Sequence, residues 1–243
     1  MKKIILLIII FILSITTIFR FSLFNHGNNE VNIKSDSVIT IPRKFTKIEY
    51  DNFEDNIDLS YYSENKEINN DYIGDLKIDG LINQKVVHTT DNEFYLNHNF
   101  EKEYFSQGSV FMDYRNTLED QNIILYGHYV YKDETAMFSP LHLLKDINNY
   151  EEYKYIFLNL GEEVRKYKIS KVYYYIMGSQ NLIFYETNYS ESEFENYMKY
   201  VDKAVFYDTG VQMSNDDSFI TLQTCVRNRD DLRLIIIGKR IEE

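Results

Sequence analysis

The 243-residue chain contains one cysteine, two prolines and no tryptophan. A single cysteine excludes an internal disulfide bond, so the hydrophobic core must hold the fold together. Basic residues are also scarce: 26 Lys and Arg stand against 38 Asp and Glu, which gives a formal net charge of −12. Such a charge repels polyanions, and we therefore expect no nucleic acid among the partners.

Aromatic residues are abundant by contrast, with 22 Tyr and 16 Phe. Their large apolar areas, in a chain of this length, supply enough buried surface for one domain to fold alone. We therefore expect a fold that needs no metal and no cofactor.

Long hydrophobic runs are absent except at the start. Residues 4–19 carry no charge and lie between Lys2, Lys3 and Arg20, and apolar residues continue to 24. A run of this length suits a membrane anchor at 1–24 with its lysines inside, crossing through residues 4–24. A cleaved signal peptide is the alternative, although no small-residue cleavage pattern follows. The remaining chain, with a formal charge of −15, would face outward.

Two further regions follow the predicted anchor. Residues 25–70 are rich in Asn, Ser, Asp, Glu and Lys, which is typical of a stalk with short helices, one of them around 43–57. Residues 71–243 form the predicted catalytic body. Its short β-branched and aromatic runs predict eight strands, at 72–78, 85–88, 109–114, 122–126, 155–159, 164–177, 218–224 and 232–238. Two helices are expected at 135–145 and 191–203, and the whole predicts a mainly β, antiparallel-rich barrel or sandwich.

Cys225 ends the apolar strand predicted at 218–224, and a polar loop follows it. This position would lift the thiol to the rim of a barrel, where neighbouring cations favour the reactive thiolate. A free cysteine is also often a small buried hydrophobic residue, and that alternative stays open.

Three arginines surround this loop. Arg227 and Arg229 lie in the polar turn, where we expect solvated side chains. Arg233 begins the next apolar strand, so a hairpin would hold its guanidinium beside Cys225, where it could bind an oxyanion. The alternative for Arg233 is an ion pair with Asp230 or Asp231.

Five histidines are candidate acids or bases. His26 lies near the predicted anchor, and His88, His98 and His142 are expected at the surface or in packing. His128 follows the strand at 122–126 and Gly127, a residue that permits close backbone approach. Thiol and imidazole together could act as nucleophile and leaving-group acid.

Several segments resemble the class B sortases, membrane-anchored cysteine transpeptidases of Gram-positive bacteria. The order of His128, then Thr221-Leu222-Gln223-Thr224-Cys225, then Arg233 is the most specific part of the resemblance. Other matching segments are 72–80, 91–100, 108–116, 122–129 and 137–141, so the resemblance spans roughly residues 72–239.

The resemblance implies an eight-stranded sortase barrel with N-terminal helices and a helix in the loop before the cysteine strand. It implies a catalytic set of His128, Cys225 and Arg233. It also implies that Asn97, with Thr221, Gln223 and Thr224 just before the cysteine, forms part of the substrate groove. Gln223 stands where a small serine is common in the family, so the groove beside the thiol is expected to differ in shape.

The implied reaction joins surface proteins to the cell wall. Cys225 would attack the carbonyl after the threonine of a C-terminal sorting signal of the LPxTG or NPxTN kind, and an amine of a peptidoglycan precursor would accept the acyl group. The enzyme would be a single-pass protein of the cell membrane with its catalytic domain on the extracellular face. Two alternatives stay open at this point: a pilin-polymerising sortase, and a non-catalytic surface-binding module with a buried cysteine.

Overall fold

The computed structural model describes residues 58–178 and 186–241. The predicted anchor at 1–24 and the helix expected around 43–57 lie outside the described residues. Within the two described ranges, no helix is long and apolar enough to cross a membrane.

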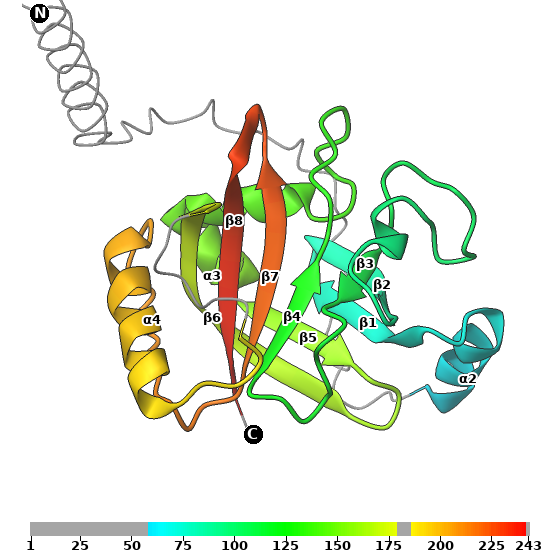
Figure 1. Ribbon diagram of the computed structural model, residues 1–243, viewed down its shortest axis with the longest axis horizontal. Coiled ribbons are helices and arrows are strands. Elements are labelled where there is room, and N and C mark those ends of the chain that lie inside the picture. The colour runs from blue at the N-terminus through cyan, green and yellow to red at the C-terminus, as the bar shows by residue number, and fades with distance from the viewer. Residues whose placement is uncertain (1–57, 179–185, 242–243) are drawn as a thin grey trace, which may run out of the picture. The chain divides into compact units, whose positions relative to one another are not determined.

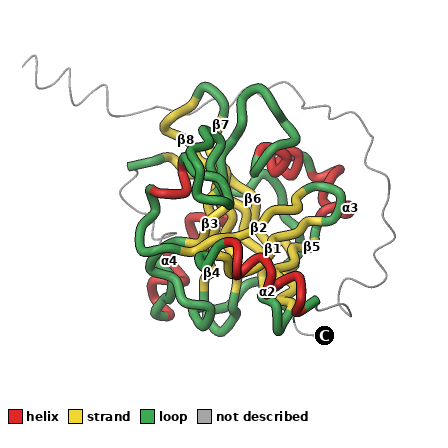
Figure 2. The backbone as a smooth tube through the Cα atoms, turned by 90° about the vertical axis from the view of Figure 1, so that its right-hand side faces the viewer, coloured by secondary structure: helices red, strands yellow, loops and turns green. Residues whose placement is uncertain are grey.

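Eight strands close into a barrel, which confirms the predicted fold class (Figures 1 and 2). They are β1 (Tyr72–Ile78), β2 (Ile82–His88), β3 (Val110–Met112), β4 (Asn122–Tyr126), β5 (Tyr155–Asn159), β6 (Val164–Ile176), β7 (Phe219–Val226) and β8 (Arg229–Arg240). Around the barrel they follow the order β1-β2-β3-β4-β7-β8-β6-β5.

The barrel is mixed, since two of its eight strand pairs are parallel. β2 runs parallel to β3, and β4 runs parallel to β7, whereas the other pairs are antiparallel. Parallel neighbours need long crossover connections. The long segment from β4 to β7 holds β5, β6 and most of the helices, so these elements all fall between two strands that lie side by side.

Among the described elements, one helix precedes β1, and the other helices and the 3-10 turns lie in the connections between strands. They are α2 (Leu59–Ile68), η1 (Phe94–Leu96), η2 (Ser139–Lys145), η3 (Ile147–Asn149), α3 (Tyr150–Tyr153) and α4 (Glu191–Ala204). The helix expected at 135–145 is therefore a shorter 3-10 helix, and Pro140 in its first turn suits a helix start. α2 packs on the barrel through the rings of Tyr62 and Tyr72, whose centroids lie 5.3 Å apart.

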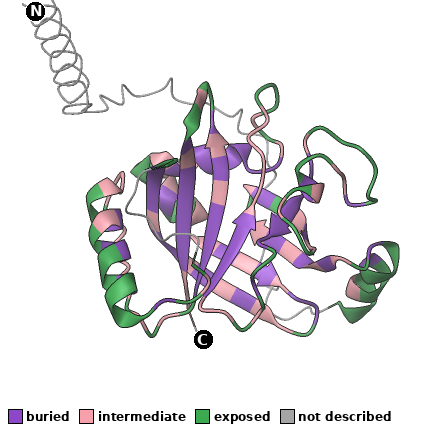
Figure 3. Cartoon of the chain, viewed as in Figure 1, coloured by how far each residue is buried: buried purple, intermediate pink, exposed green. Residues whose placement is uncertain are grey.

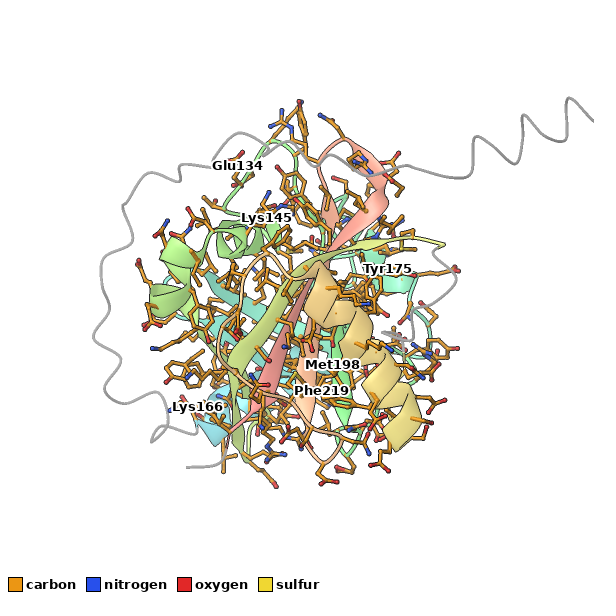
Figure 4. The ribbon with its side chains drawn as sticks, turned by 90° about the vertical axis from the view of Figure 1, so that its left-hand side faces the viewer. Glu134, Lys145, Lys166, Tyr175, Met198 and Phe219 are labelled. Carbon is orange, nitrogen blue, oxygen red and sulfur yellow. The ribbon has the colours of Figure 1, made fainter. Side chains whose placement is uncertain are left out.

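β7 and β8 are buried along most of their length (Figure 3), and the alternation of their side chains divides the core into two parts. Even-numbered residues such as Leu222 and Ile236 fill the barrel interior. Odd-numbered residues such as Phe219 and Ile235 face outward and pack under the apolar side of α4. Figure 4 labels Met198, on α4, beside Phe219 of β7.

α4 begins where the sequence predicts it, at a capping box. The Ser190 hydroxyl and main-chain N–H both donate to the Glu193 carboxylate, which satisfies groups at the open helix start. The helix lies in the segment before the cysteine strand, as the resemblance implies (Figure 1).

Candidate active site

Four neighbouring strands, β3, β4, β7 and β8, present side chains to one cleft on the outside of the barrel. Phe111 pairs with Tyr126, and Tyr126 pairs with Gln223. Cys225 pairs with Arg233 across the β7–β8 hairpin. Paired residues share a face of a sheet, so the strand register alone brings these five side chains together.

The cleft has a volume of about 270 Å³. It is lined by residues from the four strands, from the segment before β3 and from the end of β4: Asn92, Leu96, Phe111, Tyr126, Gly127, His128, Gln223, Thr224, Cys225 and Arg233. All three residues predicted to be catalytic are therefore brought to one cleft.

Cys225 is the next-to-last residue of β7 and is half-buried. The sequence predicts the thiol at a strand end, and the strand in fact continues one residue beyond it. Because the side chain lies at the wall of an open cleft, it is not the fully buried hydrophobic residue that the alternative requires.

Arg233 is held by main-chain carbonyl oxygens. Its Nη1 donates to the carbonyl of Asp230 at 2.9 Å and to that of Leu232 at 2.8 Å. The ion pair at this end of the hairpin is formed instead by Arg229 and Asp231, at 2.8 Å. A guanidinium has five N–H donors in a rigid fork, so this anchoring uses only part of its capacity.

His128 follows β4 directly after Gly127. Its Nε2 lies 2.7 Å from the main-chain oxygen of Leu96. A carbonyl can only accept, so in this arrangement Nε2 carries the proton. Gly127 is required here because a Cβ at this position would lie 2.6 Å from the ring of Phe138, closer than side chains approach.

The other described histidines lie outside the cleft lining. His88 is at the end of β2, and His98 stacks on the ring of Phe94 with centroids 4.0 Å apart. His142, expected in packing, is buried in η2, and its Nε2 lies 3.0 Å from the main-chain oxygen of Cys225. His26 lies outside the described residues.

The predicted substrate-binding residues divide into two pairs. Gln223 and Thr224 line the cleft, and each has a buried side-chain oxygen with no hydrogen-bond partner among the described residues. Asn97 is exposed at the end of η1 and is not part of the lining. Thr221 is fully buried and donates to Asn122 Oδ1 at 2.8 Å, so the structure does not bring it to the cleft.

Asp113 binds two residues of the cleft lining, a role that the sequence analysis did not predict. Its carboxylate accepts from the Tyr126 hydroxyl at 2.7 Å, from Asn92 Nδ2 at 3.2 Å and from Arg115 Nε at 2.9 Å. Burial alone would raise the pKa of Asp113, but the hydrogen bonds from Arg115 and Tyr126 lower it below its usual value. Two lining residues, Asn92 and Tyr126, are thus fixed by one buried carboxylate.

The sequence predicts solvated side chains for Arg227 and Arg229, but in the structure each contacts another residue. Arg227 lies over the ring of Tyr131, 4.2 Å from its centroid, and donates to the Tyr131 hydroxyl at 2.8 Å. This contact ties the β7–β8 turn to the loop after His128. In the described part of the chain, no three His, Cys, Asp or Glu side chains gather as a metal site.

The chain is similar to known proteins in sequence and in fold. The Sortase domain family model matches residues 76–241. Sortase B of Listeria monocytogenes is 34% identical over 188 residues, which is 72% of each chain. Sortase B of Staphylococcus aureus is 31% identical over 189 residues, or 73% of each chain. A solved mutant form of Clostridium perfringens sortase B has a TM-score of 0.69 and 29% identity, and the match covers 76% of this chain and 88% of that one.

Proposed function

Since the chain belongs to the sortase family, as a class B cysteine transpeptidase, we propose that Cys225, His128 and Arg233 carry out its reaction in the cleft. The single observation that carries this proposal is the meeting of the three side chains in one lining. They come from β7, from the end of β4 and from β8, and no other thiol exists in the chain.

In the first half of the proposed reaction, the Cys225 thiolate attacks the carbonyl carbon of the threonine in a sorting signal. A carbon–sulfur bond forms and the peptide C–N bond breaks, while the His128 imidazolium gives its proton to the departing amine. In the second half, an acceptor amine attacks the thioester, loses a proton to His128 and releases the Cys225 thiolate.

Arg233 is proposed to stabilise the negative oxygen that forms in both halves. Its backbone pairing with Cys225 keeps the guanidinium beside the thiol, and its anchoring to two main-chain carbonyls limits the side chain to few rotamers. A donor that is already in place does not have to reorganise as charge develops, which is the source of its effect on rate.

Gln223 and Thr224 are proposed to contact the substrate. A buried oxygen without a partner costs about 1–3 kcal/mol, so the Gln223 side-chain oxygen, on the same face of β7 as the nucleophile, favours a role in binding. The substrate backbone offers N–H groups that can reach the Gln223 oxygen. Thr224 is even-numbered and pairs with Leu234 of the barrel interior, so its contact with substrate would be made through its main chain. Asn97 and Thr221 stay as weaker substrate-binding predictions, since neither belongs to the lining.

The substrates we propose are surface proteins with an LPxTG-like or NPxTN-like C-terminal signal, and the acceptor is an amine of a peptidoglycan precursor. The uncharged run at 4–19, continued by apolar residues to 24, supports a single membrane crossing through residues 4–24, with the catalytic barrel on the extracellular face. Membrane fractionation of full-length protein, followed by protease added outside the cell, tests this placement. A shortened protein released into the medium would point to a cleaved signal instead.

The decisive variant is Cys225→Ala. We expect it to fold normally and to lose transfer activity entirely, because the chain has no second thiol to replace the nucleophile. Mass spectrometry of LPxTG-like and NPxTN-like peptides, incubated with full-length protein and an amine, measures both cleavage and transfer. Residual turnover above background in this variant contradicts the assignment, and use of a pilin lysine alone as acceptor would favour a pilin-polymerising role.

A further inference from the structure

His142 makes a contact with the nucleophile's own backbone that the proposed reaction does not use. Its Nε2 lies 3.0 Å from the main-chain oxygen of Cys225, and its side chain is buried. Because a carbonyl oxygen can only accept, His142 Nε2 carries the hydrogen of this bond.

The strand pattern explains why Cys225 needs this donor. The carbonyl of Gln223 accepts from Gly127 N at 3.2 Å, so it points from β7 toward β4. The carbonyl of Cys225, two residues on, points to the same side. The β4–β7 ladder ends with Tyr126 and Gln223, and a bulge follows Cys225 on the side of β8. His142 therefore takes the place of the next strand donor.

The same segment also holds His128. Phe138 N donates to the His128 carbonyl at 3.1 Å, and Val130 N donates to the Ser139 hydroxyl at 2.7 Å. The ring of His142 meets the ring of Tyr129 edge to face, with centroids 4.9 Å apart. The chain before η2 and η2 itself thus contact both the residue that carries the imidazole and the residue that carries the thiol.

We propose that His142 is a positioning residue, which sets the backbone at Cys225 relative to His128 through its hydrogen bond to the Cys225 carbonyl. This inference rests on the proposed roles of Cys225 and His128. It also goes beyond the expectation drawn from the sequence, which placed His142 at the surface or in packing. An error of about 1 Å in such a site can cost about a hundredfold in rate.

The experiment uses full-length protein and compares His142→Phe with His142→Gln. Phenylalanine keeps a buried ring and removes the donor, so we expect kcat to fall about ten- to a hundredfold while KM changes little. Glutamine keeps an N–H donor at a similar reach and should restore kcat to within about threefold of the original. The rate at which iodoacetamide alkylates Cys225 should follow the same order, without dependence on the peptide.

Tyr150→Phe is the matched control. It removes a buried hydrogen bond to a main-chain carbonyl, that of Ile169, at 2.9 Å, and neither residue lines the cleft. It should lower the melting temperature as a His142 variant does, yet leave kcat unchanged. Should His142→Phe be too unstable to assay, His142→Met serves in its place.

The outcomes separate the two proposals. Full activity in His142→Phe or His142→Met, or a glutamine variant as slow as the phenylalanine one, overturns the positioning role. If Cys225→Ala itself still transfers peptides, the proposed function fails, and that result does not depend on His142.

Discussion

The outward face of β7 and β8 has two halves, which differ in their side chains and in what covers them. Over one half, α4 packs its apolar side on Phe219, Ile235 and Ile237, and these residues are fully buried. Over the other half, the same alternation presents Gln223, Cys225 and Arg233 to an open cleft. We conclude that the strand register places both sets of side chains on the outward face. The part of this face that α4 covers is core, and the part that it leaves open forms the cleft.

The covered half behaves as ordinary core even where it holds polar groups. The hydroxyls of Tyr173 and Tyr197 lie 3.0 Å apart and are buried, and burial raises the pKa of both well above its usual value. One hydroxyl donates to the other, so these polar groups are paired within the core. In the cleft, by contrast, Gln223 keeps a side-chain oxygen with no partner among the described residues.

The largest effect on stability is expected from removing a buried side chain in the half that α4 covers. Phe219→Ala removes a fully buried ring that meets Phe194 and Tyr189, and it should lower the free energy of unfolding by about 3–5 kcal/mol. Urea titration measures this loss. Below the melting transition kcat should stay unchanged, with Phe219→Leu as a milder control, and a large fall in kcat of the folded variant would mean that the two halves are coupled.

The matching change in the open half is Arg233→Ala. It should slow the reaction about 10²–10³-fold, as is typical when an oxyanion donor is lost, with little effect on unfolding. Arg233→Lys should recover little of the rate, since a point charge does not reproduce the guanidinium fork. Steady-state kinetics on the peptide that the unaltered enzyme cleaves provide the test, and full recovery by lysine would show that charge alone is sufficient.

Asp113 tests how far a buried charge stabilises the open half, because its buried carboxylate binds the cleft residue Tyr126. Asp113→Asn keeps the volume and removes the charge that Arg115 and Tyr126 bind, so we expect a loss of about 1.5–3 kcal/mol near neutral pH. Since the folded-state pKa is lowered, the carboxylate stabilises the fold above its unfolded pKa of about 3.9, and this contribution disappears as the pH falls through the lower folded value.

Thermal unfolding at several pH values checks this account. The difference in stability between the original protein and Asp113→Asn should be constant from about pH 5 to 7 and shrink below about pH 4. A difference that is independent of pH down to pH 2 would show that the amide substitution acts through shape and not through charge.

Much of the fold could be predicted because strand patterns are local. β1, β4 and β5 have the bounds that the sequence predicts, and α4 begins where its capping box predicts. The Cys225–Arg233 pairing could be predicted too, since a short turn between two apolar runs favours a hairpin. The parallel β2–β3 and β4–β7 pairs could not, because they depend on crossovers whose geometry no local pattern encodes.

The rest of the site depends on contacts between distant segments. Asn92 and Leu96 reach the cleft through a long connection between β2 and β3, and nothing in their own sequence marks them as lining residues. The segment at 91–100 carried a family resemblance, which pointed to Asn97 within it and not to its neighbours. His142 likewise resembles a packing residue in the sequence. Its contact with the Cys225 carbonyl depends on where the β4–β7 ladder ends, which the sequence does not show.

The smallest effect distinguishes the two arginines of the β7–β8 turn, beyond the open half. Arg229 pairs with Asp231 inside the turn, and such exposed pairs contribute little, so Arg229→Ala should leave kcat within about twofold of the original. Arg227 instead contacts both the ring and the hydroxyl of Tyr131, which lies on the loop that follows His128. Arg227→Ala should therefore slow the reaction by a few fold, and Tyr131→Ala should have the same effect with no further loss in the double variant. If Arg227→Ala, Tyr131→Ala and the double variant all match the original enzyme in kcat, this contact does not help to hold the loop, and the cleft does not depend on the β7–β8 turn.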